Sequence, residues 1–125
     1  MKAAIITGAA RGIGLATTDI LCSHGWQVIM VDRDGEELAL QAAQRSNVTT
    51  ASYDISDPKQ VEAMVTQALA THGQIDALVN NAGVADFGPI EDTTFARWRR
   101  VMETNLDGVF LCTQAALPAL KKSQG

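Results

Sequence analysis

The sequence is poor in features that define whole classes of protein. Two cysteines in 125 residues are too few for a disulfide scaffold and are typical of a chain from a reducing compartment. Charged residues make up 19% and hydrophobic residues 46%, which excludes a disordered chain. A chain of this length buries about two thirds of the surface of its unfolded form. We therefore expect one folded domain with a hydrophobic core.

Long apolar runs and a dominant positive charge are also missing. No run approaches the about 18 residues that a membrane span needs, which argues against a membrane protein. The first apolar run breaks at Gly8 after a single charge, so no signal peptide is predicted. Ten basic residues stand against 14 acidic ones without a basic stripe, which argues against nucleic acid as a partner. A cytoplasmic protein is the expectation.

The residues that bind metals or act as nucleophiles are few and scattered. His24 and His72 each precede a glycine at the end of a predicted helix, where a glycine suits the left-handed position. Neither histidine has cysteine or histidine neighbours at ligand spacing, so no metal site is predicted. Cys22 and Cys112 fall in separate helices without an obvious base, and we interpret both as core residues.

Short apolar runs alternate with helical patterns along the chain. The predicted strands are Lys2–Thr7, Gln27–Asp32, Val48–Asp54 and Ile75–Asn80, and the predicted helices are Gly12–His24, Asp34–Arg45 and Pro58–His72. A loop over 81–92 then leads into one kinked helix or two helices over 93–121, with interruptions at Asn105, Asp107-Gly108 and Pro118. Such an alternation favours an α/β fold with a doubly wound parallel sheet and helices on both faces.

A glycine-rich turn follows the first predicted strand and opens the first helix. Gly8, Gly12 and Gly14 have the spacing G-x-x-x-G-x-G. Gly8 permits the tight turn, Gly12 lets the backbone approach a pyrophosphate at the positive end of the helix, and Gly14 lets that helix pack on the sheet. A plain strand–helix turn is the alternative interpretation. The context is the one that a dinucleotide site requires.

Asp32 strengthens the nucleotide interpretation. It ends the second predicted strand, 18 residues after Gly14, close to the ~20 expected for an acid that binds a ribose diol. A carboxylate there accepts from both ribose hydroxyls and repels a 2′-phosphate, so NAD is favoured over NADP. Arg11 and Arg33 act in the opposite direction, because either could pair with a phosphate. A solvated strand end remains the alternative for Asp32.

Taken together, several motifs resemble the short-chain dehydrogenase/reductase family. They are Thr7-Gly8-x-x-x-Gly12-x-Gly14, Asp32, Asp54-Ile55, Asn80-Asn81-Ala82-Gly83 and Asn105. The resemblance runs from about residue 3 to residue 121. It implies a Rossmann-like domain over 1–125 with strand order 3-2-1-4, incomplete at its C-terminal side, and an activity that transfers hydride between a nicotinamide and an alcohol or carbonyl carbon.

The resemblance also implies a role for each matching residue. Gly8, Arg11, Gly12, Ile13 and Gly14 would bind the pyrophosphate side of the cofactor, Asp32 and Arg33 would lie at the ribose, Asp54 and Ile55 would flank the adenine, Asn81, Ala82 and Gly83 would line the adenosine side, and Asn105 would belong to a proton relay. Read without the family, Asp54 is a strand end before a helix cap, the Asn-Asn-Ala-Gly segment is a sharp turn, and Asn105 is a kink or a surface residue.

The reaction centre of the family is absent from these residues. The family uses a serine, a tyrosine and a lysine four residues after the tyrosine, all beyond the helix at which this sequence ends. The single tyrosine, Tyr53, falls in the third predicted strand, and Asp57 stands four residues on. We therefore expect an amino-terminal half that binds NAD and does not turn over alone. Whether the chain is part of an enzyme stays open, and a non-catalytic nucleotide-binding or protein-interaction remnant is the alternative.

The predicted strand order leaves the fourth strand at an edge of the sheet. An apolar edge at Ile75–Val79 invites pairing with another chain. The helix after Asn105 would also carry apolar surface that family members use for dimer contacts. Self-association through this edge and this helix is therefore expected. A flavodoxin-like signalling domain fits the alternation of elements but explains neither the glycine turn nor the Asn-Asn-Ala-Gly segment.

Overall fold

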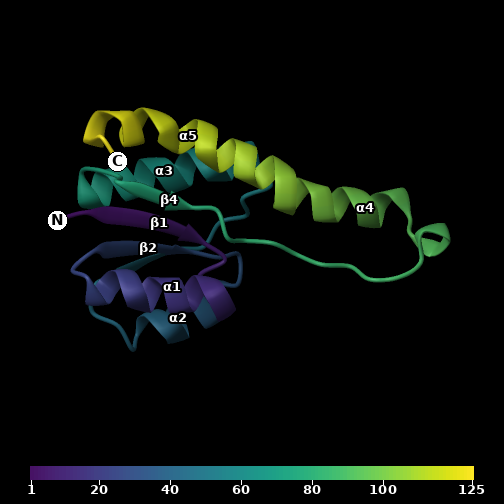
Figure 1. Ribbon diagram of the computed structural model, residues 1–125, viewed down its shortest axis with the longest axis horizontal. Coiled ribbons are helices and arrows are strands. Elements are labelled where there is room, and N and C mark those ends of the chain that lie inside the picture. Colours follow the sequence, from purple (N-terminus) through teal and green to yellow (C-terminus); the bar gives the residue numbers. More distant parts are fainter.

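The computed structural model describes residues 1–125 and contains a four-stranded parallel sheet covered by helices on both faces (Figure 1). The elements in chain order are β1 (Ala3–Thr7), α1 (Gly12–Ser23), β2 (Gln27–Val31), α2 (Gly35–Ala42), β3 (Val48–Ala51), α3 (Pro58–His72), β4 (Ala77–Val79), α4 (Phe95–Met102) and α5 (Gly108–Ser123). The strand order is β3-β2-β1-β4, as predicted. The fold is therefore the doubly wound, Rossmann-like architecture that the alternation of elements indicated.

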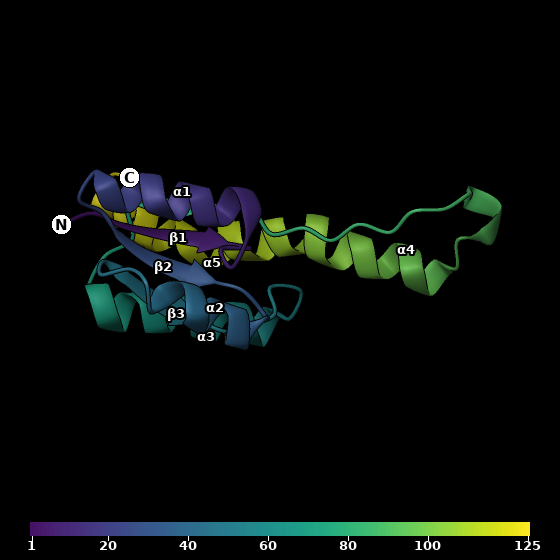
Figure 2. The same cartoon turned by 90° about the horizontal axis from the view of Figure 1, so that it is seen from below.

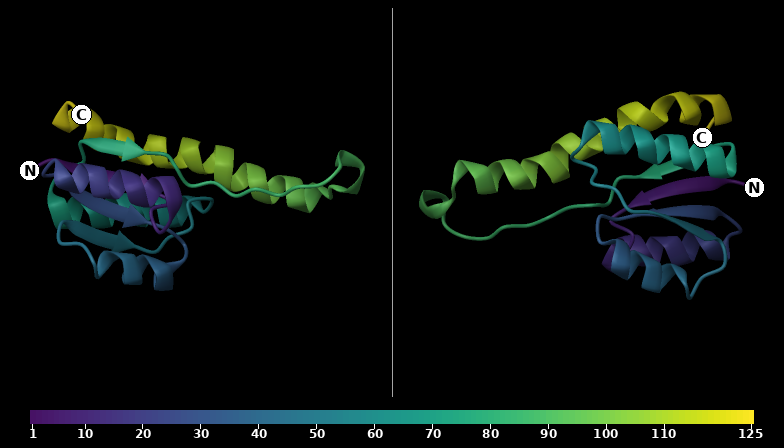
Figure 3. Two further views of the ribbon diagram at one scale, coloured as in Figure 1. Left: turned by 60° about the horizontal axis from the view of Figure 1, so that its bottom comes forward. Right: turned by 180° about the vertical axis from the view of Figure 1, so that it is seen from behind.

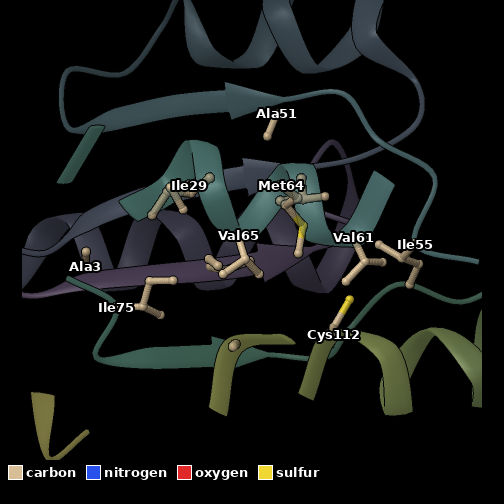
Figure 4. Close-up of a cluster of buried hydrophobic side chains, with 13 residues drawn as sticks. Ala3, Ile29, Ala51, Ile55, Val61, Met64, Val65, Ile75 and Cys112 are labelled. Carbon is tan, nitrogen blue, oxygen red and sulfur yellow. The ribbon is translucent and has the colours of Figure 1, made fainter. Parts of the chain in front are cut away.

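Two hydrophobic layers hold the helices on the sheet. The larger layer lies between the sheet and the helices α3 and α5, and includes Ile5, Ile29, Met64, Ile75 and Cys112 (Figure 4). The smaller layer lies under α1 and α2, as Figure 2 shows from below. Because β1 and β2 are covered on both faces, nearly all of their side chains are buried. Their continuous apolar pattern is the one expected for a parallel sheet.

The strands are shorter than predicted because aspartate side chains replace the strand pairing at their ends. Asp32 and Asp54 both lie outside the strands, and their carboxylates accept from the backbone two residues on, at Asp34 (3.0 Å) and Ser56 (3.0 Å). At the start of β4, Asp76 accepts the N–H of Ala3 through its carboxylate at 2.9 Å. Local side-chain bonds of this kind compete with the ladder and terminate it.

The predicted helix ends agree closely with the structure. Gly25 and Gly73 adopt left-handed backbone angles (φ 82° and 77°) after α1 and α3, as predicted. Asp57 caps α3 with Pro58 in its first turn. Gln60 in the first turn of α3 donates to the Asp57 carboxylate at 3.2 Å and accepts the N–H of Asp54 at 2.8 Å. It therefore bonds the cap residue and also connects the helix to the segment after β3.

Residues 95–123 form one continuous helical run, with a π-helical turn at Glu103–Asp107 between α4 and α5. Of the predicted interruptions, Asn105 lies within this turn, whereas Pro118 lies inside α5 without ending it. The loop over 83–94, which contains a short 3₁₀ turn at Ile90–Asp92, runs outward alongside α4, which leads back to the domain (Figure 3). This loop and α4 project from the body of the domain, away from both termini (Figure 1).

Candidate functional site

The glycine turn after β1 has the geometry that only glycine provides easily. Gly8 and Gly12 have positive φ angles of 65° and 56°, which cost other residues strain. A Cβ on Gly14 would lie 2.3 Å from the carbonyl oxygen of Gly8, so any side chain there would separate α1 from the turn. A Cβ on Gly12 would meet nothing within 4 Å. The turn is therefore packed from behind and open in front, where a ligand can approach the backbone.

The segment after β4 is bonded directly to this turn. The Asn81 amide donates to the carbonyl oxygens of Thr7 (3.0 Å) and Gly8 (3.2 Å). In return, the buried Thr7 hydroxyl accepts the backbone N–H groups of Asn81 and Ala82, each at 3.0 Å. A side-chain ladder thus extends the pairing of β1 with β4 beyond the last strand residue. The Asn81 side chain thus mainly supports the structure, whereas the adjacent Asn80 side chain is exposed and forms a hydrogen bond only with Thr113.

A cavity of about 500 Å³ opens at the carboxyl end of the sheet, against the glycine turn. It is lined by Gly8, Arg11, Gly12, Val31, Asp32, Arg33, Asp34, Tyr53, Asp54, Ile55, Asn81, Ala82, Gly83, Val84 and Thr104. This edge of a parallel sheet is where open α/β folds bind ligands. The fold thus brings together ten of the twelve residues predicted for the cofactor. Gly14 lies behind the turn, and Ile13 is 78% exposed outside the cavity.

Asp32 and two neighbours form a bonded cluster at one end of the cavity. The Asp32 carboxylate accepts the N–H of Ala10 (3.3 Å) with one oxygen and that of Asp34 (3.0 Å) with the other. These bonds orient the carboxylate while leaving its remaining lone pairs free to accept. Beside it, Arg11 forms an ion pair with Asp34 at 2.5 Å. The hydrogen bond from Arg11 holds the pKa of Asp34 below its usual value, so both groups are charged at neutral pH.

The two residues predicted at the adenine differ in what they can offer a ligand. Asp54 accepts both the hydroxyl (2.7 Å) and the N–H of Ser56 with one oxygen, and the hydroxyl bond is the main reason that its pKa is lowered. Its second oxygen is free of protein partners. Ile55 is only 6% exposed and packs against Gly108, where a Cβ would come within 2.7 Å of its side chain. Ile55 is therefore a core residue whose edge reaches the cavity.

Asn105 is bonded on both sides of its amide to one residue. Its side chain accepts the N–H of Val84 and donates to the carbonyl oxygen of Val84, each at 2.8 Å. This pair imitates a strand contact and connects the π-helical turn to the loop after β4. The predicted relay role stays a prediction, since the side-chain amide is occupied by the loop. Val84 and Thr104 also line the cavity, and no local motif marks them.

Tyr53 is not a strand residue, which corrects the prediction. It follows β3, lines the cavity and donates its hydroxyl to Gln67 of α3 at 2.8 Å. The buried cysteine of α5 is also unavailable as a nucleophile. Cys112 is fully buried, and burial raises the pKa of its thiol to about 11. A thiol with such a pKa is inert at neutral pH.

The histidines lie away from the cavity. His72 bonds the Thr49 hydroxyl at 3.1 Å, and His24 bonds the carbonyl oxygen of Ile20 at 2.8 Å. No three metal-ligating side chains gather anywhere in the chain. None of the helices combines the length and apolar character that crossing a bilayer requires.

Comparisons with known proteins place the chain in a family. The model of the short chain dehydrogenase family matches residues 2–125. Trans-4-hydroxycyclohexanecarboxylate dehydrogenase of Sinomonas cyclohexanicum is 36% identical, over 99% of this chain and 52% of its own length. Meso-2,3-butanediol dehydrogenase of Serratia marcescens is 35% identical, over 99% of this chain and 50% of its own length. The chain thus spans about half the length of these curated relatives.

Solved structures agree with this match. A 3-ketoacyl-(acyl-carrier-protein) reductase from Brucella melitensis complexed with NADH superposes with a TM-score of 0.94 at 32% identity, over 98% of this chain and 51% of the other. A metagenomic short-chain oxidoreductase in complex with NADP superposes with a TM-score of 0.91 at 35% identity, over 98% and 58%. Both nicotinamide cofactors therefore occur among the structural neighbours.

Proposed function

The chain belongs to the short-chain dehydrogenase family, and from this premise we propose that it is the cofactor-binding half of an NAD-dependent oxidoreductase. Asp32 is the observation that carries the choice of NAD. Its carboxylate is oriented by Ala10 and Asp34 at the end of the cavity, where it would accept from the ribose hydroxyls of the adenosine. A 2′-phosphate at the same place would meet a fixed negative charge.

The residues around the cavity fit such a dinucleotide. The open space in front of Gly12 lets a pyrophosphate approach the backbone at the start of α1. Asn81, Ala82 and Gly83 form the wall opposite, held in place by Thr7. The free oxygen of Asp54 would accept from the adenine amino group. When bound, the nicotinamide would supply the hydride acceptor or donor for an alcohol or carbonyl substrate.

In this proposal the chain binds and orients the cofactor without completing the reaction. No tyrosine is followed by a lysine four residues on, and Tyr53 is bonded to Gln67. Asn105 would contribute to a proton relay through its backbone or a bound water, because its side chain is held by Val84. The chain alone should therefore bind NAD and should not oxidise secondary alcohols.

The test is a calorimetric titration of NAD⁺ into the chain and into Asp32→Asn. We expect Asp32→Asn to weaken NAD⁺ binding about tenfold or more, because a charged acceptor for the ribose is lost. Asp57→Asn is the matched control, because the Asp57 carboxylate also accepts the backbone N–H two residues on, at 3.0 Å, but lies outside the cavity. No binding at millimolar NAD⁺ by a chain with a folded circular dichroism spectrum would contradict the proposal and favour an interaction role. NAD-dependent oxidation of secondary alcohols by the chain, in a preparation free of longer protein, would contradict the proposal that the chain alone is not catalytic.

The intact mass of the protein in its source cells tests the complete assignment. A mass about twice the 13.3 kDa of these residues is expected for a complete oxidoreductase of this family. Its additional residues should contain the serine, tyrosine and lysine. A mass near 13.3 kDa would instead support a non-catalytic nucleotide-binding chain.

A further inference from the structure

Two arginines lie at the ribose end of the cavity, and they differ in their partners. Arg11 is paired with Asp34 at 2.5 Å, whereas no carboxylate oxygen lies within ion-pair distance of Arg33. The hydroxyl and N–H of Ser56 are the main causes of the lowered pKa of Asp54, and the charge of Arg33 adds a smaller contribution. Whether the Arg11 guanidinium is free to bind a ligand next to Asp32 therefore depends on one other side chain, that of Asp34.

Asp34 is held in place from two directions. Its carboxylate caps α2 by accepting the N–H of Glu37 at 3.2 Å, and its backbone N–H donates to Asp32 at 3.0 Å. The second carboxylate oxygen receives Arg11. The helix cap thus fixes a negative charge beside the ribose carboxylate, and that charge in turn holds the guanidinium.

We propose that Asp34 determines cofactor specificity by keeping the Arg11 guanidinium away from the 2′-phosphate of NADP. The proposal rests on the nucleotide site proposed above and assigns a role to a residue that the sequence motifs do not include. A guanidinium binds phosphate with paired hydrogen bonds, so an Arg11 without its Asp34 partner would increase the affinity for a 2′-phosphate. While Asp34 is charged, a 2′-phosphate must compete for Arg11 and also lies near two carboxylates.

This arrangement discriminates by withholding a favourable contact from the wrong ligand. Specificity is a difference between two affinities, and holding Arg11 on Asp34 lowers only the affinity for NADP, because only NADP carries the 2′-phosphate that Arg11 would bind. The ion pair is partly exposed, with 62% and 40% of the two side chains accessible, so its strength is modest and reversible. We therefore expect a shift of preference rather than its complete reversal, because Asp32 remains in place.

The experiment compares the dissociation constants of NAD⁺ and NADP⁺ for four forms of the chain, measured by calorimetry. The forms are the wild type, Asp34→Asn, Arg11→Gln and the double variant. Asparagine caps helices as well as aspartate does, so Asp34→Asn removes the charge and keeps α2. The affinity for NADP⁺ relative to NAD⁺ should rise about five- to tenfold in Asp34→Asn. It should return to the wild-type ratio in the double variant.

The control and the contrary outcomes separate this inference from the proposed function. Asp57→Asn removes the same charge from the cap of α3 and should leave the ratio unchanged. A wild-type chain that binds neither nucleotide would overturn the proposed function, and this inference with it. Binding of NAD⁺ with an unmoved ratio in Asp34→Asn would overturn the inference alone. A gain that survives Arg11→Gln would also overturn it, because general charge would then be the cause.

Discussion

The Asn81 amide donates to the carbonyl oxygen of Gly8 at 3.2 Å and so joins the end of β4 to the turn that follows β1. The same amide nitrogen lies 2.6 Å from the position that a Cβ on Gly14 would take. The turn, the first residues of α1 and the end of β4 therefore meet at one point behind the cavity. Changes at this point should alter nucleotide binding without touching the nucleotide.

Gly14→Ala should weaken both folding and nucleotide binding. The new methyl group would lie 2.3 Å from the carbonyl oxygen of Gly8, which belongs to the backbone and cannot rotate away. We expect a loss of about 1–3 kcal/mol in the free energy of unfolding, as for other overpacked sites. Urea denaturation and NAD⁺ calorimetry measure the two effects.

Gly25→Ala is the control for this substitution. Gly25 also has a positive φ, of 82°, but a Cβ there would meet nothing within 4 Å. It should cost about 1–2 kcal/mol of backbone strain and leave the affinity for NAD⁺ intact. Equal affinities for Gly14→Ala and the wild type would show that the turn tolerates displacement of α1.

Asn81→Ala should destabilise the fold more than Asn80→Ala does. Removing the Asn81 amide leaves the carbonyl oxygens of Thr7 and Gly8 without their side-chain donor, at a cost of about 1–3 kcal/mol. Asn80 differs by one position but is exposed and bonds only Thr113 at 3.1 Å, so its loss should be near neutral. Chemical denaturation of both variants measures the difference. Equal losses of stability would refute the role assigned to Asn81.

The sequence was informative wherever a single residue determines the local backbone conformation or the order of the strands. Gly8, Gly12 and Gly14 could be assigned because a turn, a close approach and a packed helix each exclude side chains. The strand order followed from the glycine turn on β1 and was confirmed. The predicted ends of β2 and β3 were too late, because Asp32 and Asp54 were assigned as the last strand residues. In the structure their side chains bond the backbone locally, outside the strands.

Contacts between distant residues could not be predicted in the same way. The bonds of Asn105 to Val84 and the ion pair of Arg11 with Asp34 depend on how two elements lie in space, and neither has a spacing rule. The final helix shows the same limit. The helical periodicity predicts one face with Leu106, Phe110 and Leu117, but the buried face is formed by smaller residues, Thr104, Gly108, Cys112 and Ala116. Small residues were favoured there because α5 lies close to the sheet and α3.

The stability of the chain should fall as pH decreases through the titration of His72. Burial lowers the pKa of this imidazole below 6.5, so the unfolded chain binds the proton more readily than the folded chain. The contribution is fully present above the unfolded pKa of about 6.5 and is lost as the pH falls from there through the lower pKa of the folded state. His72→Gln should flatten the dependence of Tm on pH in this range.

The comparison variant is His24→Gln, which changes the exposed histidine at the end of α1. It should leave the slope of Tm against pH as in the wild type. Thermal denaturation followed by circular dichroism measures both. A wild-type Tm that is constant between pH 7.5 and 5.5 would show that His72 does not control stability.

The face of the final helix that contains Leu106, Phe110 and Leu117 should cause the chain to self-associate. These side chains are 58%, 62% and 42% exposed, and they follow one another along the run that also carries exposed Phe95 and Trp98. β4 is the strand at one end of the sheet order and pairs only with β1, so its other edge has no neighbouring strand. A contiguous apolar surface of this kind is rare on a soluble monomer and favours pairing with a second copy.

Phe110→Glu should therefore shift the chain toward a monomer of 13.3 kDa in light scattering at micromolar concentration. Leu40→Glu is the matched control, because Leu40 is 59% exposed on α2, which covers the opposite face of the sheet. That variant should associate like the wild type, since it lies outside the helical run. If the wild type is already monodisperse at 13.3 kDa, or if both variants dissociate equally, the apolar face is not the interface and the exposed side chains must be explained by contacts other than a second copy.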